Sequence, residues 1–112
     1  MTFDLKTLGA VGVALAVMAS PGSASAKSPE AAGRAIARRD CGGCHAVGRR
    51  DKSRMPEAPA FRTLGERYNV EDLAEALAEG ISVGHPEMPV AIYPPEQVAQ
   101  LIAYLKALQP RR

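Results

Sequence analysis

The chain has 112 residues, a formal net charge of +2, two cysteines and no tryptophan. We expect these residues to form a single domain. The arginines are not accompanied by a platform of aromatic residues on which nucleic-acid bases could stack, so the composition argues against a nucleic-acid-binding protein.

Residues 1–26 have the pattern of a cleaved secretory signal. Thr7–Ala19 is an uncharged run of 13 residues, Pro21-Gly22 interrupts it, and Ala24-Ser25-Ala26 supplies the small residues of a cleavage site. The run is shorter than the roughly 20 residues that a membrane-spanning helix needs. We therefore expect a mature domain over residues 27–112 without stable membrane insertion. An uncleaved anchor is the alternative.

The most informative motif is Cys41-Gly42-Gly43-Cys44-His45, the attachment signature of c-type haem. Each thiol adds across one vinyl group of the porphyrin, so the two sulfurs must reach opposite sides of one haem edge. The imidazole that follows is then placed under the iron as an axial ligand. The motif predicts one covalent haem c, attached through Cys41 and Cys44, with His45 as an iron ligand.

Three other interpretations of the two cysteines are less favoured. A dithiol redox pair is expected in a βαβ context, and no convincing strand pattern surrounds this motif. A zinc site built from Cys41, Cys44, His45 and His85 would require two adjacent residues to occupy two tetrahedral positions. A disulfide between Cys41 and Cys44 would close a loop too short to stabilise the fold much.

Covalent attachment of haem in bacteria takes place outside the cytoplasmic membrane, so the motif and the N-terminal signal both predict a periplasmic protein. A chain this short buries only about 60% of its unfolded surface, which leaves its own core marginal. A buried porphyrin supplies the missing apolar mass. We therefore expect the form without haem to fold poorly.

The mature segment shows helical patterns and no strands, which predicts an all-α fold. Ser28 is the expected N-cap of the first helix, and Pro29 occupies a first helical position, where a missing N–H costs nothing. Asn69 is the expected cap of the middle helix. The expected helices are Pro29–Asp40, Val70–Ala78 and Pro95–Gln109, with a short turn near Phe61–Tyr68 as a further candidate.

A haem protein that only transfers electrons needs a second axial ligand, because an open position on the iron binds small molecules. Met88 lies before a proline in a Gly- and Pro-rich loop, which allows the loop to fold over the second haem face. The alternative is His85 as the ligand, with Met88 in the core. Met55 lies among basic residues and is expected to be exposed. Tyr68 and Tyr93 are candidates for hydrogen bonds to the haem propionates or to the Met88 sulfur, or for plain packing.

These features together resemble the small soluble monohaem cytochromes c of class I, over residues 28–109. Members of this family have an N-terminal helix that leads into Cys-x-x-Cys-His, a mid-chain helix, a Met-Pro loop and a C-terminal amphipathic helix that packs across the first. The resemblance implies a cytochrome c fold of three main helices wrapped around one haem. It further implies thioether bonds at Cys41 and Cys44, with His45 as the proximal ligand and Met88 as the distal ligand.

The resemblance also implies roles for residues outside the motif. Gly33 resembles the family glycine at the crossing of the terminal helices, and Leu101 and Tyr104 resemble the residues that pack there. This chain has Ala37 where many relatives carry a bulkier residue. Pro59 resembles the family proline whose backbone carbonyl receives the N–H of the proximal histidine and fixes its tautomer.

The net charge is distributed unevenly. Residues 27–54 hold eight Lys and Arg against three acids, a net of +5, whereas residues 55–112 hold five against eight, a net of −3. The positive block brackets the haem-binding motif, near which the resemblance implies an exposed haem edge. We expect this charge to steer acidic-surfaced redox proteins, as donor and acceptor. A merely solvated basic loop is the alternative.

The expected function is that of a periplasmic, monomeric one-electron carrier of a respiratory chain, and not of an enzyme. The polypeptide would position and tune a haem iron that cycles between Fe(II) and Fe(III). One alternative is a haem subunit docked permanently on a dehydrogenase or oxidase. The other is a gas- or peroxide-reactive haem protein, which requires that Met88 does not bind the iron.

Overall fold

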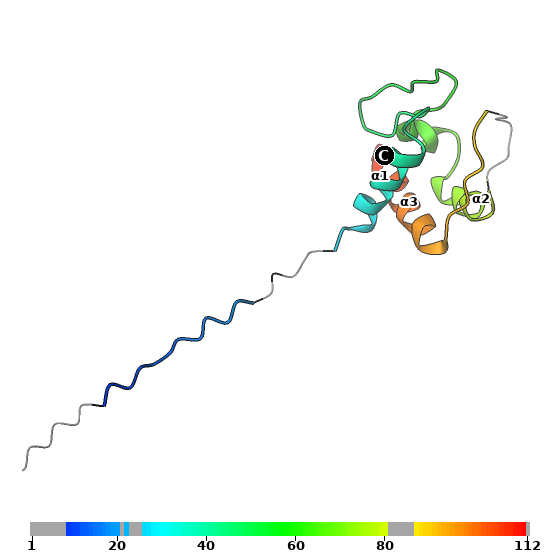
Figure 1. Cartoon of the computed structure of the whole chain (residues 1–112). Helices are drawn as coiled ribbons and strands as arrows, with labels where there is room; N and C mark the ends of the chain where they lie inside the picture. The colour runs from blue at the N-terminus through cyan, green and yellow to red at the C-terminus, as the bar shows by residue number, and fades with distance from the viewer. Residues whose placement is uncertain (1–8, 21, 23–25, 81–86, 112) are drawn as a thin grey trace, which may run out of the picture.

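The computed structural model describes residues 9–20, 22, 26–80 and 87–111. Within these residues the chain forms helices and loops and no strand, which confirms the all-α prediction, and Figure 1 shows the helices gathered with the loops at their periphery. The elements in chain order are α1 (Pro29–Asp40), the 3₁₀ helices η1 (Phe61–Glu66) and η2 (Val70–Asp72), α2 (Leu73–Glu79) and α3 (Pro95–Leu108).

The boundaries of α1 are the predicted ones because they are set by neighbouring residues. The Ser28 hydroxyl oxygen accepts a hydrogen bond from the backbone N–H of Ala31 at 3.2 Å, which caps one of the unpaired donors at the helix start. Pro29 follows at the first helical position. Apart from Ile36, the apolar residues of this helix are small, so α1 can come close to a partner helix.

The middle helix begins later than predicted. Residues 70–72 form a tighter 3₁₀ turn, and the α-helix starts only at Leu73. The Asn69 side chain does act as a cap, since its oxygen accepts a hydrogen bond from the backbone N–H of Glu71 at 3.2 Å. 3₁₀ turns are frequent at helix N-termini. Gly80, with a φ of 102°, ends the helix in a conformation that glycine adopts at little cost.

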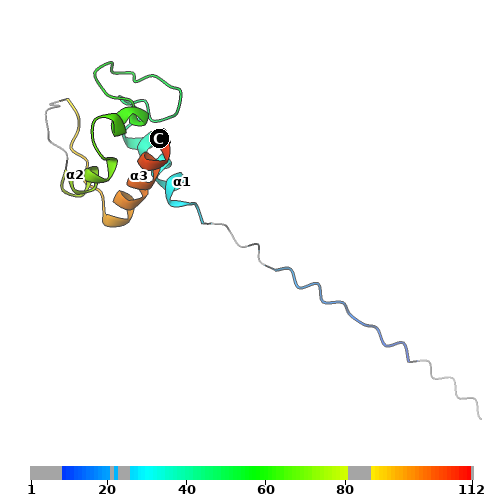
Figure 2. The same cartoon turned by 180° about the vertical axis from the view of Figure 1, so that it is seen from behind.

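The terminal helices cross at Gly33, and Figures 1 and 2 show this crossing from both sides. A Cβ atom at Gly33 would lie 1.9 Å from the carbonyl oxygen of Gln100 and 2.9 Å from the Cβ of Tyr104. Only glycine permits this approach. Leu101 and Tyr104, the two residues expected at the crossing, are buried in the core together with Ala37.

The loop after the haem motif is held by hydrogen bonds on both sides. The Asp51 carboxylate accepts from the backbone N–H groups of Val47 and Gly48 at 3.1 and 2.9 Å. The Tyr104 hydroxyl donates to the backbone carbonyl of Val47, and burial raises the pKa of this hydroxyl. The Arg49 guanidinium donates to the carbonyl of Ala107 at 3.1 Å. The loop is therefore fixed to α3.

Residues 9–20 form neither helix nor strand, and their apolar side chains are exposed. No helix in the described part of the chain is long and apolar enough to cross a membrane. Ala24 and Ser25 of the expected cleavage site lie outside the described residues, as does His85. The secretory signal stays a prediction.

Replacing Gly33 with alanine is expected to lower the free energy of unfolding by about 3 kcal/mol, because the added methyl group collides with the backbone of α3. Urea unfolding followed by circular dichroism measures this loss. Gly43→Ala is the matched control, since a Cβ at Gly43 would meet nothing within 4 Å. Equal stabilities of wild type and Gly33→Ala would contradict the close crossing.

Candidate haem site

A cavity of about 390 Å³ lies between the Cys41–His45 turn and residues 87–93. This volume falls within the ~300–1,000 Å³ typical of cofactor sites. The two cysteines of the motif, His45 and Met88 all line the cavity, as do Met55 and Tyr93. The structure thus brings the four principal site residues predicted from the sequence to one place.

The attachment turn continues directly from α1. The backbone N–H of Cys41 donates to the carbonyl of Ala37, and the N–H of His45 donates to the carbonyl of Cys41, both at 2.9 Å. A Cβ at Gly42 would lie 2.8 Å from the carbonyl oxygen of Arg38, so this turn requires the first glycine. It does not require Gly43. The turn carries both cysteine side chains to the cavity wall.

The His45 imidazole is held in one tautomer. Its Nδ1 lies 2.8 Å from the backbone carbonyl oxygen of Pro59, which is the contact expected of that proline. A carbonyl oxygen can only accept, so Nδ1 carries the proton and Nε2 presents a lone pair suited to a metal ion. The ring of Phe61 packs against the imidazole, with centroids 5.0 Å apart. The residues present therefore fit an imidazole-ligated haem.

Both described methionines of the mature segment, Met55 and Met88, line the cavity, and both are half-buried. The prediction that Met55 is exposed was wrong. Its backbone N–H donates to the carbonyl of Cys44 at 3.2 Å, which draws the loop back toward the attachment turn. The repeated Met-Pro pair, at residues 55–56 and 88–89, is the sequence signal that could have indicated this placement.

The environment of Cys41 argues against a redox dithiol. Burial, reinforced by the neighbouring Asp40 carboxylate, raises the pKa of the Cys41 thiol to about 11. Reactive dithiols need the opposite, a lowered thiol pKa that favours the thiolate. Both cysteines are free of disulfide bonds. The proposed zinc set depends on His85, which is not among the described residues.

Asp40 lines the cavity, although it was not among the site residues predicted from the sequence. Its carboxylate accepts a hydrogen bond from the Tyr93 hydroxyl at 2.9 Å and a bidentate pair from the Arg39 guanidinium at 2.7 and 2.9 Å. The bond from Arg39 holds the pKa of Asp40 below its usual range. Burial, and then the bond to Asp40, raises the pKa of Tyr93. The sequence did hold one indication of its role: Asp40 is an acid in the last position of a helix, where the helix dipole favours cations.

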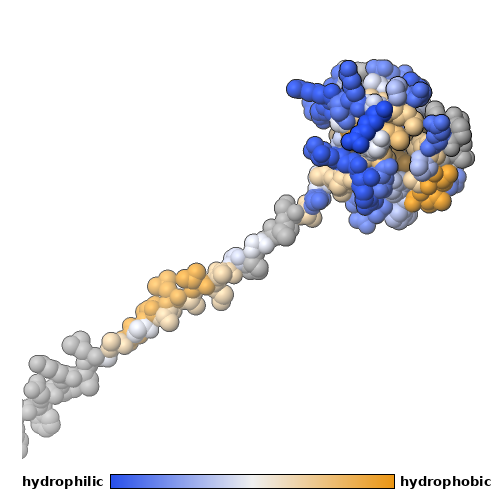
Figure 3. Space-filling view, turned by 45° about the horizontal axis from the view of Figure 1, so that its top comes forward, coloured by the Kyte–Doolittle hydropathy of each residue, from blue (hydrophilic) through white to orange (hydrophobic). Residues whose placement is uncertain are grey.

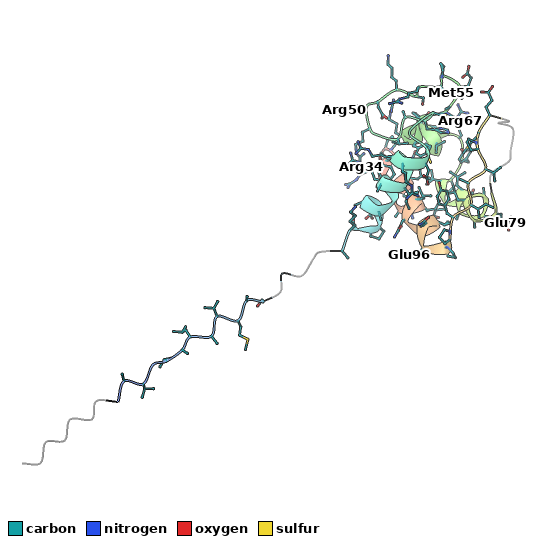
Figure 4. All side chains as sticks on the ribbon, in the orientation of Figure 1. Arg34, Arg50, Met55, Arg67, Glu79 and Glu96 are labelled. Carbon is teal, nitrogen blue, oxygen red and sulfur yellow. The ribbon has the colours of Figure 1, made fainter. Side chains whose placement is uncertain are left out.

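The cavity lining is mostly apolar, its charged members are acidic, and the positive charge lies beside it. Asp40, Glu57 and Glu87 line the cavity, and none of its described lining residues is Lys or Arg. Figure 4 shows Arg34 and Arg50 on the opposite side of the domain from Glu79, and Figure 3 shows hydrophilic side chains gathered on one side. We call the following exposed residues the basic surface: Arg34, Arg38, Arg39, Arg49, Arg50, Lys52 and Arg54.

An attachment turn that carries two thiols to a cavity, an imidazole oriented by a carbonyl and an all-helical frame define a small protein that binds haem c. Residues 30–109 match the family model described as Cytochrome c, and the chain belongs to this family. The all-α cytochrome c fold and the covalently bound haem c expected at Cys41 and Cys44 follow from this membership.

The family works in haem-based electron transfer, and its members are in general electron carriers rather than enzymes. Comparisons with curated proteins and with solved structures found no match.

Protein prepared without haem is expected to lose cooperative folding. A penalty of about 24 cal/mol per Å³ makes the empty cavity of about 390 Å³ cost at most about 9 kcal/mol. This cost is comparable with the ~5–15 kcal/mol that stabilises a typical domain. The Cys41→Ser/Cys44→Ser double variant, purified free of haem, supplies the sample. Far-UV circular dichroism and urea unfolding measure the loss, and a sharp cooperative transition in that variant would refute the expectation.

Proposed function

We propose that the protein is a periplasmic one-electron carrier of a respiratory chain, with His45 and Met88 as the axial ligands of its haem c. The observation that carries this proposal is that one cavity is lined by both cysteines, an imidazole and a thioether. When bound, the haem supplies an iron that alternates between Fe(II) and Fe(III). The role of the polypeptide is to hold, tune and shield this group.

The side chains around the cavity act on the reduction potential in opposite directions. A thioether favours reduced iron and so raises the potential. The three carboxylates that line the cavity, Asp40, Glu57 and Glu87, favour the more positive oxidised state through Coulomb attraction. The hydrogen bond from His45 to Pro59 raises the basicity of the imidazole and fixes its plane. No proton transfer or bond-making step is assigned to any of these residues, so we propose no enzymatic activity.

The basic surface is the proposed docking region for redox partners with acidic surfaces. Three of its members, Arg34, Arg38 and Arg49, are close enough to the Tyr104 hydroxyl to oppose the rise of its pKa that burial causes, so their charges gather near the helix crossing. A positive field of this kind speeds the encounter with a negatively charged partner and fixes its orientation. In this proposal the electron donor and the electron acceptor both bind a monomeric carrier by attraction between their acidic surfaces and its basic surface.

A permanently docked haem subunit is the second candidate function. The side chains of Val90 and Ile92 are 61% and 65% exposed, beside the cavity-lining residues Pro89 and Ala91. Exposed aliphatic side chains next to a redox site suit a stable interface better than a brief encounter. Purification of the mature protein in a lasting complex with one dehydrogenase or oxidase would favour this candidate over the mobile carrier.

Met88→Ala in the haem-loaded protein is expected to abolish the thioether-to-iron absorption band, to lower the reduction potential and to allow the reduced protein to bind carbon monoxide at neutral pH. Wild type should not bind carbon monoxide. His85→Ala should keep the band, and Met55→Ala is the matched control, because its sulfur-bearing side chain lines the same cavity. Loss of the band in the His85 variant alone would overturn the assignment of Met88.

Charge reversal on the basic surface is expected to slow electron transfer to an acidic redox protein by about tenfold at low salt and to have little effect at high salt. Arg50→Glu makes this change, and stopped-flow mixing over a range of ionic strength measures the rate. Lys106→Glu is the control, because it alters the net charge equally from a residue that pairs with Glu71 of η2. Equal slowing by both variants would contradict docking at the basic surface.

A further inference from the structure

We propose that the hydrogen bond between Tyr93 and Asp40 is a latch that holds residues 87–93, the segment of Met88, closed over the haem cavity. The idea that this closure keeps a ligand on the iron rests on the proposed role of Met88. The latch itself rests on contacts within the chain. In this proposal Tyr93 and Asp40 are positioning residues, which act on the site through the segment that they hold.

The segment 87–93 is fixed to the rest of the chain through one residue. Among the described residues, 87–93 makes two hydrogen bonds to the rest of the chain, and both come from Tyr93. Its backbone N–H donates to the carbonyl of Leu77 at 3.0 Å, which ties it to α2. Its hydroxyl donates to the carboxylate of Asp40 at 2.9 Å, which ties it to the end of α1. Only the second bond crosses the cavity to the wall formed by the end of α1 and the Cys41–His45 turn, which we call the attachment wall.

The ring of Tyr93 is the most deeply buried part of this segment. Tyr93 is 7% exposed and belongs to the core, whereas Val90 and Ile92 of the same stretch are 61% and 65% exposed. The ring therefore gives the segment its main apolar contact. A hydroxyl carried inside with that ring must find a partner, because a buried donor without one loses the hydrogen bond it made to water.

The acceptor, the Asp40 carboxylate, is held in place by a neighbouring residue. The guanidinium of Arg39 donates two parallel hydrogen bonds to the Asp40 carboxylate. This geometry fixes the orientation of the carboxylate and strengthens the pair. Asp40 is followed directly by Cys41, the first attachment residue. The latch thus joins the stretch that carries Met88 to the stretch to which the haem is attached.

The consequence concerns the entry of other ligands. A small molecule that competes with Met88 must enter while residues 87–93 are open, so its apparent affinity is its intrinsic affinity multiplied by the open fraction. Removal of the latch raises that fraction. A hydrogen bond to a charged acceptor is strong enough to change it by about tenfold or more.

The test measures imidazole binding to the oxidised, haem-loaded protein by absorption. Tyr93→Phe and Asp40→Ala are each expected to bind imidazole about tenfold more tightly than wild type. The double variant should gain no more than either single variant, because both remove the same bond. Without imidazole, all three variants should keep the thioether-to-iron band.

Tyr104→Phe is the matched control. Tyr104 is also 7% exposed, and its hydroxyl also bonds to a distant residue, the carbonyl of Val47, but at the helix crossing rather than at the cavity. This variant should lose stability toward urea without a change in imidazole affinity. Unchanged affinity in Tyr93→Phe and Asp40→Ala, or an equal gain in Tyr104→Phe, would overturn the latch.

Met88→Ala, measured alongside, reports on the proposed function alone. An unchanged absorption spectrum in that variant would remove Met88 as the ligand. The comparison of Tyr93→Phe with Tyr104→Phe would still decide on the latch, because a closed segment hinders imidazole whichever group it displaces.

Discussion

The close contact of α1 with α3 at Gly33 is the constraint on which the haem site depends. α1 ends at Asp40 and Cys41 follows without an intervening loop, so the position of this helix sets the position of both cysteines. The backbone of Gln100 leaves no room for a side chain at Gly33, and the crossing therefore has one geometry. Two longer-range bonds then orient the imidazole: the N–H of Phe61 donates to the Ala46 carbonyl, and the Pro59 carbonyl accepts from His45. The motif is local, but the orientation of its histidine is a tertiary property.

The features that could be predicted from the sequence are those that neighbouring residues determine, such as helix boundaries and the attachment motif. Pro29–Asp40 was predicted to the residue because Ser28 and Pro29 set its start, and α3 ends one residue before the predicted Gln109. The attachment motif is local in the same sense. The later start of α2 was not visible, because a 3₁₀ turn and an α-helix share similar capping signals.

The features that escaped prediction join residues far apart. Met55 is turned toward the cavity by a bond to the carbonyl of Cys44, eleven residues earlier in a loop with no periodic pattern. Asp40 meets a tyrosine 53 positions later, and no spacing rule relates the two. The distribution of charge shows the same limit. Positive charge around the motif was predicted from the sequence. That the cavity itself is lined by three carboxylates and by no described Lys or Arg was not.

The two walls of the cavity are supported unequally, and this difference has a thermodynamic consequence. The attachment wall is tied to α1 and, through residues 46–61, to α3. In the described part of the chain the opposite wall, residues 87–93, is tied by hydrogen bonds through Tyr93 alone.

With Met88 as the proposed ligand, the closed state of that wall gains free energy from the bond to iron, as any binding to one state stabilises it. A thioether prefers reduced iron, so reduction favours the closed state and oxidation weakens it. By linkage, whatever favours closure must in turn favour the reduced form. In this proposal the Tyr93–Asp40 bond raises the reduction potential without touching the iron, whereas the negative charge of Asp40 lowers it.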